Sequence, residues 1–260
     1  MPVLDPGLLN DSTLPWRVRV VDEVGSTSDA VREAAMTGEE PGLVLFAESQ
    51  TAGRGRRQNR WLAPRGKDLM FSLLLQPEAP TPLWPRMTTL AALALCRAIE
   101  DELPLKPRIK WPNDLYVNDR KVSGLLAEVV TTKSGLMLVL GIGLNVNTRQ
   151  FAPELEGVAA SLLSCMPFAQ TPELDRNPLA AALLQQLHAQ FQRIEDGFHE
   201  AVAETRERSW LLGRQIRATV DGSELFGRAV DLDSEGRLMI ALPDGSITAV
   251  GSAESVRQVV

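Results

Sequence analysis

Four arginines and two glycines crowd into one short stretch of the sequence, between Gln50 and Trp61. From residue 51 to residue 70 the chain carries six basic side chains against one acid, although the whole protein has 27 basic and 33 acidic residues. Glycine lets the backbone approach a ligand closely, and the planar arginine fork pairs with phosphate or carboxylate. This stretch, the Gly-Arg loop of residues 50–61, therefore predicts a site that captures a small polyanion.

The Gly-Arg loop matches neither of two common phosphate-binding motifs. No Gly-Lys-Ser/Thr follows it, which excludes a P-loop, and the third glycine of a dinucleotide fingerprint is missing. Two alternatives remain, a solvated loop without function and a nucleic-acid contact in which Trp61 stacks on a base. The formal net charge of −6 argues against general coating of nucleic acid, which relies on positive potential.

Ser26, Thr27 and Ser28 stand directly before an alanine-rich helical pattern. One of these hydroxyls is expected to cap the helix, but three exceed what a single cap requires. Because a helix N-terminus with spare hydroxyls and amides can hold a polar ligand, this segment is a second candidate binding site.

Asn113 and Asp114 follow Pro112, which interrupts a strand pattern because proline cannot donate to the ladder. The pair either forms an ordinary turn or contacts a nucleotide, with Asp114 as a Mg²⁺ ligand. Lys110 lies just upstream, on the strand piece that leads into the interruption.

Lys121 opens the strand that returns from a hairpin turn predicted at Asn118-Asp119. Alternation with period two puts Lys121 and Ser123 on one face of this strand and Gly124 on the other. By pattern alone Lys121 is a solvated hairpin lysine, whereas a glycine inside a strand often marks the close approach of a ligand. A second face with little bulk follows on the next strand, formed by Gly141, Gly143, Asn145 and Asn147.

Strand and helix patterns alternate over most of the chain. Strands are expected at 16–21, 42–47, 69–75, 109–117, 121–128 and 136–140, and helices after Ser28 and at 86–102, 178–197 and 200–212. This pattern predicts an α/β (α+β) fold with a mixed central sheet and flanking helices. From Gly213 onward short strands with tight turns indicate a small β-barrel. We therefore expect a lead-in at 1–15, extended or poorly ordered, a catalytic domain at 16–212 and a barrel at 213–260.

Cys96 and Cys165 stand in no pair motif and predict free thiols in a reducing compartment. Neither a signal peptide nor an apolar run long enough for a membrane span is evident. We expect a cytoplasmic protein that does not associate with membranes.

Taken together, four motifs resemble those of the biotin protein ligases, in the same order and with similar spacing. They are Gln50…Gly53-Arg54-Gly55-Arg56…Trp61, Lys110-Trp111-Pro112-Asn113-Asp114, Lys121-Val122-Ser123-Gly124 and Gly141-Ile142-Gly143-Leu144-Asn145. The resemblance implies a class II synthetase-like catalytic domain with an SH3-like barrel. It also implies that biotin attacks ATP with Mg²⁺ to give biotinyl-5′-AMP, and that a lysine of a biotin carboxyl carrier protein then attacks this intermediate. The carrier belongs to acetyl-CoA carboxylase or another biotin-dependent carboxylase.

The resemblance also carries residue roles onto matching positions of this sequence. Those for biotin are Ser26, Thr27, Ser28, Gln50, Arg54, Gly55, Arg56, Lys121 and Gly124. Those for ATP or the adenylate are Gly53, Arg56, Trp61, Lys110, Asn113, Asp114 and Asn145, with Asp114 also assigned to Mg²⁺. Catalytic roles fall on Lys121, Arg54 and Arg56.

This sequence departs from the family pattern at Gln58-Asn59, where bacterial loops often continue with Gly-Arg, and at Ser28, where asparagine is common. The short segment before the first strand leaves no room for the DNA-binding domain of repressor members, so we expect the monofunctional type without a DNA partner. Oligomeric state is open between a monomer and a homodimer.

Two other functions stay open. A lipoate or octanoate ligase has the related fold, but its Arg-Arg…Gly-Gly-Gly signature is absent here. A nucleic-acid-binding protein could use the Gly-Arg loop, but it would not explain Asn113-Asp114 and Lys121.

Overall fold

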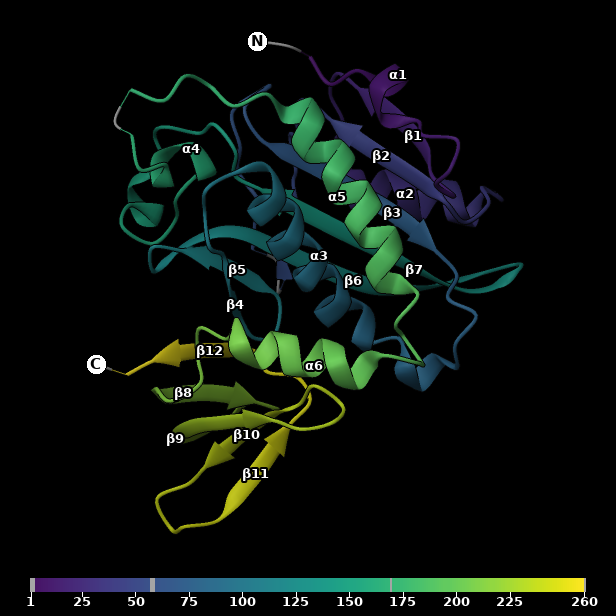
Figure 1. Ribbon diagram of the computed structural model, residues 1–260. Helices are drawn as coiled ribbons and strands as arrows, with labels where there is room; N and C mark the ends of the chain where they lie inside the picture. The colour runs from purple at the N-terminus through teal and green to yellow at the C-terminus, as the bar shows by residue number, and fades with distance from the viewer. Residues whose placement is uncertain (1–2, 57–58, 169, 260) are drawn as a thin grey trace.

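The computed structural model describes residues 3–56, 59–168 and 170–259, and it contains two β-sheets (Figure 1). The larger sheet has seven strands in the order β1-β2-β3-β7-β6-β5-β4. Only β1 and β2 run parallel, and the other neighbours pair antiparallel, so the predicted mixed sheet is confirmed. Its strands are β1 (Arg17–Val21), β2 (Leu43–Ala47), β3 (Leu69–Leu75), β4 (Arg108–Lys110), β5 (Asp114–Val117), β6 (Arg120–Thr132) and β7 (Gly135–Leu144).

Helices cover both faces of this sheet and create two apolar clusters. On one face, Val31 and Ala35 pack with strand residues such as Leu74 and Val139. On the other face, Phe71 and many neighbours pack beneath α3 and α5. The helices are α1 (Pro6–Leu9), α2 (Thr27–Met36), α3 (Arg86–Glu102), α4 (Leu162–Cys165), α5 (Arg176–Phe191) and α6 (Phe198–Glu207), with 3₁₀ turns η2 (Thr81–Leu83) and η3 (Pro153–Leu155).

The N-terminal segment is more ordered than the sequence suggested. Asp5 caps the short helix α1 by accepting from the Gly7 amide, with Pro6 at the first helical position. Leu4 and Leu9 are both 2 % exposed, and the Leu4 amide donates to the Glu48 carboxylate. The expectation of an extended or poorly ordered lead-in was therefore wrong for the described residues, because two leucines anchor this segment to the core.

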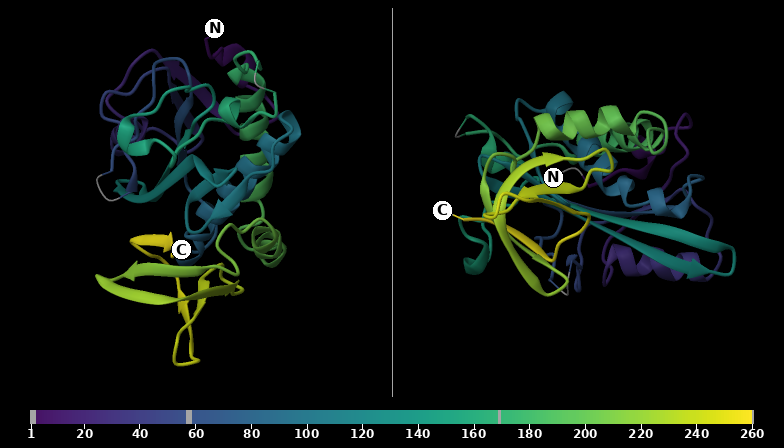
Figure 2. Two further views of the ribbon diagram at one scale, coloured as in Figure 1. Left: turned by 90° about the vertical axis from the view of Figure 1, so that its left-hand side faces the viewer. Right: turned by 90° about the horizontal axis from the view of Figure 1, so that it is seen from below.

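The second sheet is antiparallel and has five strands in the order β11-β10-β9-β8-β12. The small all-β unit expected from Gly213 onward is confirmed, although β12 was not predicted, since Val256 is its only apolar residue. In the left-hand view of Figure 2 this sheet lies against one end of the larger unit. Its strands are β8 (Gln215–Val220), β9 (Ser223–Leu232), β10 (Leu238–Ala241), β11 (Ile247–Val250) and β12 (Ser255–Gln258).

Two local features of the hairpin β5–β6 decide where Lys121 points. Asn118 and Asp119 have φ angles of 50° and 60°, as the predicted two-residue turn requires. The pairing then shifts by one residue, because Leu115 faces Ser123 while Tyr116 faces Lys121. This bulge breaks the simple alternation expected from the sequence.

The remaining sequence expectations concern cysteines and membranes. Cys96 and Cys165 are free, as predicted, and the structure buries both of them. Within the described ranges, every helix is too short or too polar to cross a lipid bilayer.

Candidate active site

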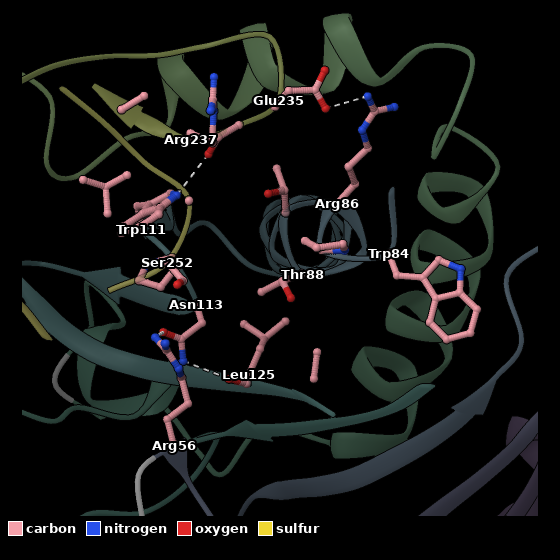
Figure 3. A pocket seen from close by; sticks show the side chains of 18 of the residues that line it. Arg56, Trp84, Arg86, Thr88, Trp111, Asn113, Leu125, Glu235, Arg237 and Ser252 are labelled. Carbon is pink, nitrogen blue, oxygen red and sulfur yellow. Dashed lines mark hydrogen bonds and ion pairs between the residues drawn. The ribbon is translucent and has the colours of Figure 1, made fainter. Parts of the chain in front are cut away.

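Two adjoining cavities lie beside β6. The inner cavity has a volume of about 50 Å³ and lies on the face of the sheet that α2 covers. The cleft has a volume of about 1020 Å³ and lies between the opposite face and the second sheet (Figure 3). Both are lined by Arg56 and Asn113, beside the point where β5 begins opposite Gly124 of β6. The inner cavity is lined by Thr27, Ser28, Gln50, Arg54, Gly55, Arg56, Trp61, Asn113, Lys121, Gly124, Leu125, Leu126, Gly141, Ile142 and Gly143.

Glycines on β6 and β7 make room for the indole ring of Trp61, which lies directly on the sheet. A Cβ atom at Gly143 would stand 2.4 Å from the Trp61 ring, and one at Gly124 would stand 3.2 Å from it. The two glycines face each other across the strands. The low bulk that the sequence showed on these strands therefore accommodates a protein side chain, which closes the inner cavity.

Hydroxyl groups form the other end of the inner cavity. The Thr27 amide donates to Gln50 Oε1 at 2.7 Å, and the Thr27 and Ser28 hydroxyls lie 2.8 Å and 3.0 Å from Ser72 Oγ. Ser26 instead caps α2, since its hydroxyl accepts from the Asp29 amide. Of the three successive hydroxyls, one serves the helix and two are left for the cavity.

Lys121 is turned into the inner cavity by the bulge in β6. Its Nζ lies 2.7 Å from Asp114 Oδ1 and 5.9 Å from the centre of the Trp61 ring. The same Nζ lies 3.2 Å from where a Cβ of Gly124 would stand, so Lys121 and Gly124 share a face. The expectation that they lie on opposite faces was wrong, because the bulge adds one residue between them.

Arg56 connects the wall between the two cavities to the second sheet. It donates to Asn113 Oδ1 and to the carbonyl of Ala253, both at 2.9 Å. Asn113 is itself held by its side-chain donation to the Leu125 carbonyl at 2.8 Å. A guanidinium in this place can meet an anion that enters either cavity.

Arg54 is engaged by two carboxylates of the protein. It lies 2.7 Å from Asp29 at the start of α2 and 2.8 Å from Glu128 on β6. Burial lowers the pKa of the Arg54 guanidinium, but its hydrogen bonds with Glu128 and Asp29 outweigh burial and leave that pKa raised. The charge of Arg54 therefore fixes the Gly-Arg loop onto neighbouring elements.

Comparison with known proteins identifies the family. The model of the biotin/lipoate A/B protein ligase family matches residues 22–145, and that of the biotin protein ligase C-terminal domain matches residues 211–254. The chain is 34 % identical to the biotin–[acetyl-CoA-carboxylase] ligase of Mycobacterium tuberculosis, over 98 % of this chain and 96 % of that protein. The chain belongs to the biotin protein ligase family.

Two further relatives agree with this assignment. The bifunctional ligase/repressor BirA of Bacillus subtilis is 29 % identical over 92 % of this chain and 77 % of that protein. The structure of the biotin protein ligase from Aquifex aeolicus in complex with biotin and ATP superposes with a TM-score of 0.83. The two sequences are 28 % identical, and the superposition covers 94 % of this chain and 99 % of the Aquifex aeolicus chain.

Several residues that match biotin ligase motifs do not line either of the two cavities. Lys110 Nζ contacts the Tyr116 hydroxyl at 3.0 Å, and burial lowers the pKa of this ammonium group against the attraction of Asp114. Asn145 is 4 % exposed and donates to the Ala160 carbonyl at 3.0 Å. Gly53 lies under the backbone of Trp61, where a Cβ would stand 2.5 Å from the carbonyl oxygen. Arg57 and Gln58 of the Gly-Arg loop lie outside the described residues.

Sequence reasoning missed four residues that hold the lining of the two cavities in place. Ser72 supports the hydroxyls of α2, Asp29 and Glu128 hold Arg54, and Ala253 accepts from Arg56. Ser72 alone left a signal, since it is the single polar residue of the apolar strand Leu69–Leu75. The others are ordinary surface or loop residues whose partners are set only by the tertiary structure.

Proposed function

We propose that this chain joins biotin to a lysine of the carrier protein of acetyl-CoA carboxylase, with ATP and through biotinyl-5′-AMP. The observation that carries this proposal is that Lys121 lines the inner cavity together with Arg56 and Asn113, which also line the open cleft. Cationic donors fixed in this way stabilise negative charge that develops during a reaction. Membership of the biotin protein ligase family supports biotin as the acid and ATP as the nucleotide.

The first step joins biotin to AMP. Biotin enters the inner cavity with its ring system at Thr27, Ser28 and Gln50 and its carboxylate toward Lys121. A carboxylate oxygen attacks the α-phosphorus of ATP, a carbon–oxygen–phosphorus anhydride forms, and the bond to the leaving pyrophosphate breaks. Lys121 and Arg56 stabilise the charge on the carboxylate and phosphate oxygens.

The second step transfers biotin to the carrier. The lysine amine of the carrier attacks the carbonyl carbon of biotinyl-5′-AMP, a carbon–nitrogen bond forms, the bond to the phosphate oxygen breaks, and AMP leaves. The cleft gives ATP, pyrophosphate and the carrier lysine a route between solvent and the reacting atoms. Closure of the Gly-Arg loop shields the reactive anhydride from water.

The inner cavity must enlarge before biotin can bind. Its volume of about 50 Å³ holds only about one or two water molecules. Trp61 is the wall suited to move, since its buried Nε1 has no hydrogen-bond partner among the described residues. Displacement of this ring would open the sheet above Gly124 and Gly143.

Mg²⁺ would be the activating ion that accompanies ATP. Among residues 3–56, 59–168 and 170–259 no three His, Cys, Asp or Glu side chains gather into a metal site. A single carboxylate fits a Mg²⁺ ion that keeps waters and binds mainly to phosphate oxygens. Asp114 would supply that carboxylate after exchanging its contact with Lys121.

The remaining proposals concern organisation. We assign catalysis to a domain at 16–212 and support of the cleft to a small domain at 213–260. The free, buried thiols of Cys96 and Cys165 support a cytoplasmic location. Sedimentation of the purified chain would decide between a monomer and a homodimer.

The test is pyrophosphate release from ATP with biotin, and separately with lipoate or octanoate. Release that requires biotin, with the mass of biotinyl-5′-AMP retained on the protein, is the expected result. Release with lipoate or octanoate alone would change the substrate and keep the fold. No release with any acid would overturn the ligase function and make nucleic-acid binding by the Gly-Arg loop the next assay.

A further inference from the structure

Ser72 is a polar residue in a strand that is otherwise apolar. It is fully buried on β3, and its Oγ lies 2.8 Å from Thr27 Oγ1 and 3.0 Å from Ser28 Oγ. A buried hydroxyl without a partner is costly, so it is retained where partners satisfy it. The partners of Ser72 are the two hydroxyls that face the inner cavity.

The hydroxyls form a chain that ends on a group able only to accept. Gln50 Oε1 accepts from the Thr27 amide at 2.7 Å and lies 3.3 Å from the Thr27 hydroxyl. A carboxamide oxygen has no proton to give, so donation runs from Ser28 to Ser72, from Ser72 to Thr27 and from Thr27 to Gln50. The Gln50 nitrogen is then left to donate into the cavity, and lone pairs of Thr27 and Ser28 are left to accept.

The backbone of the sheet fixes Ser72 in place. Ser72 pairs with Leu45 on β2 and with Gly141 on β7, so strands hold it on both sides. A Cβ at Gly141 would stand 2.4 Å from Ser28 Oγ and 3.5 Å from Ser72 Oγ, so the missing side chain leaves space for both hydroxyls. Ser72 thus ties the start of a helix to the centre of a sheet.

We propose that Ser72 is a positioning residue that makes the inner cavity selective for acids that carry a cyclic urea, which rests on the proposed function. A cyclic urea has one carbonyl acceptor and two N–H donors. These match the Gln50 donor and the hydroxyl acceptors that Ser72 holds in register. An acid with only an aliphatic chain or a dithiolane ring leaves these polar groups unpaired on binding, which costs affinity.

The test compares wild type, Ser72→Ala and Ser72→Thr in pyrophosphate release with biotin and with desthiobiotin, which keeps the urea ring and lacks the sulfur. For Ser72→Ala the KM for either acid should rise by about five- to tenfold, as expected for one lost hydrogen bond. The kcat and the KM for ATP should stay within about twofold, since Ser72 is remote from the phosphates. Ser72→Thr keeps the hydroxyl and should restore the KM.

Thr205→Val is the matched control, because it also removes a buried hydroxyl, which donates to the Ala201 carbonyl at 2.8 Å within α6. It should leave both KM values unchanged. A loss confined to biotin would assign Ser72 to the sulfur and overturn the inference, as would an unchanged KM or a fall in kcat alone. If Ser72→Ala does not fold, Ser72→Cys replaces it in the same comparison. Absence of biotin-dependent release by wild type would instead overturn the proposed function.

Discussion

Lys121 shows how one extra residue in a strand changes what a side chain can do. The sequence alternation grouped Lys121 with Ser123, whereas the bulge places it beside Gly124 and Trp61. Bulges commonly re-aim a side chain next to a functional site. A lysine that looks solvated by pattern is thereby brought into the inner cavity, where Asp114 is its partner.

Lys121→Met should abolish adenylate formation while the fold persists. Removal of one group that stabilises charge in a transition state lowers a rate by about 100- to 1,000-fold. The lost pair with Asp114 is partly exposed, with side chains 30 % and 19 % exposed, so it should cost about 1 kcal/mol or less. Pyrophosphate release and thermal unfolding measure the two effects. Pyrophosphate release at the wild-type rate by the folded variant would contradict the catalytic role of Lys121.

Gly143→Ala should destabilise the free protein more than Gly124→Ala. The new Cβ at residue 143 would stand 2.4 Å from the Trp61 ring, whereas the one at residue 124 meets the Lys121 side chain and the ring edge at 3.2 Å or more. Overpacking of this kind lowers the free energy of unfolding by about 1–3 kcal/mol, because Trp61 must shift off the sheet. Urea unfolding without biotin measures both variants. Equal losses of stability would show that Trp61 does not depend on the space above Gly143.

At the residue scale, the sequence predicted which residues line the inner cavity better than it predicted which residues they contact. Thr27, Gln50 and Lys121 reach the inner cavity as their motifs suggested. Asn145 lies instead on the Ala160 carbonyl, which no local pattern encodes because the two residues meet only after the loop folds back. Ser72 stands out in the sequence as a serine in an apolar strand, but its contacts form only because the start of α2 lies next to it.

At the scale of elements, the Gly-Arg loop is held in place by the contacts of Arg54 and Arg56. Arg54 binds α2 and β6, and Arg56 binds the segment before β5 and the segment before β12. The position of the loop therefore depends on contacts with four other segments of the chain. Loss of one of these contacts should affect retention of a bound intermediate more than the stability of the sheet.

Arg56→Ala should speed the release of biotinyl-5′-AMP. The variant loses a charged donor at the wall between the two cavities, and hydrogen bonds to a charged group contribute about 1.5–3 kcal/mol, or about 10- to 100-fold in release rate. A filter assay that follows the retained intermediate measures this rate. Arg60→Ala is the control in the same loop, since Arg60 donates to the Thr51 carbonyl of the loop itself. Similar release from wild type and Arg56→Ala would rule out a retaining role.

Element prediction succeeded where periodicity was strong and failed where anchoring came from afar. The apolar runs at 42–47 and 69–75 became central strands with every residue of β2 and β3 buried. The helix α1 has only four residues and the edge strand β12 only one apolar residue, and each segment is held by contacts far along the chain. Local pattern cannot predict such elements, because their stability comes from tertiary packing.

At the scale of the whole molecule, the two sheets form the cleft together. Trp111 donates to the Gly236 carbonyl at 3.0 Å, and Arg86 pairs with Glu235 at 2.8 Å (Figure 3). On the outer side, Arg206 of α6 binds Asp231 at 2.7 Å. These contacts make the width of the cleft depend on how firmly α6 and α3 are joined.

Glu204 provides that joint and should make stability depend on pH. It binds Arg97 of α3 at 2.5 Å and Arg193 at 2.9 Å. Burial raises the pKa of the Glu204 carboxyl, but the two arginines outweigh burial and hold that pKa below its ordinary value of 4.5. A depressed native pKa contributes stability above pH 4.5, and this contribution is lost as the pH falls through the native pKa.

Glu204→Gln should therefore lower the free energy of unfolding at pH 7 by about 1.5–3 kcal/mol, the range for hydrogen bonds to charged groups. The difference from wild type should shrink once the pH falls below 4.5, because protonation removes the same charge from wild type. Urea unfolding at a series of pH values measures this difference, with Glu207→Gln at an exposed position of the same helix as control. A difference that stays constant down to pH 3.5 would show that packing of the side chain, and not its charge, joins α6 to α3.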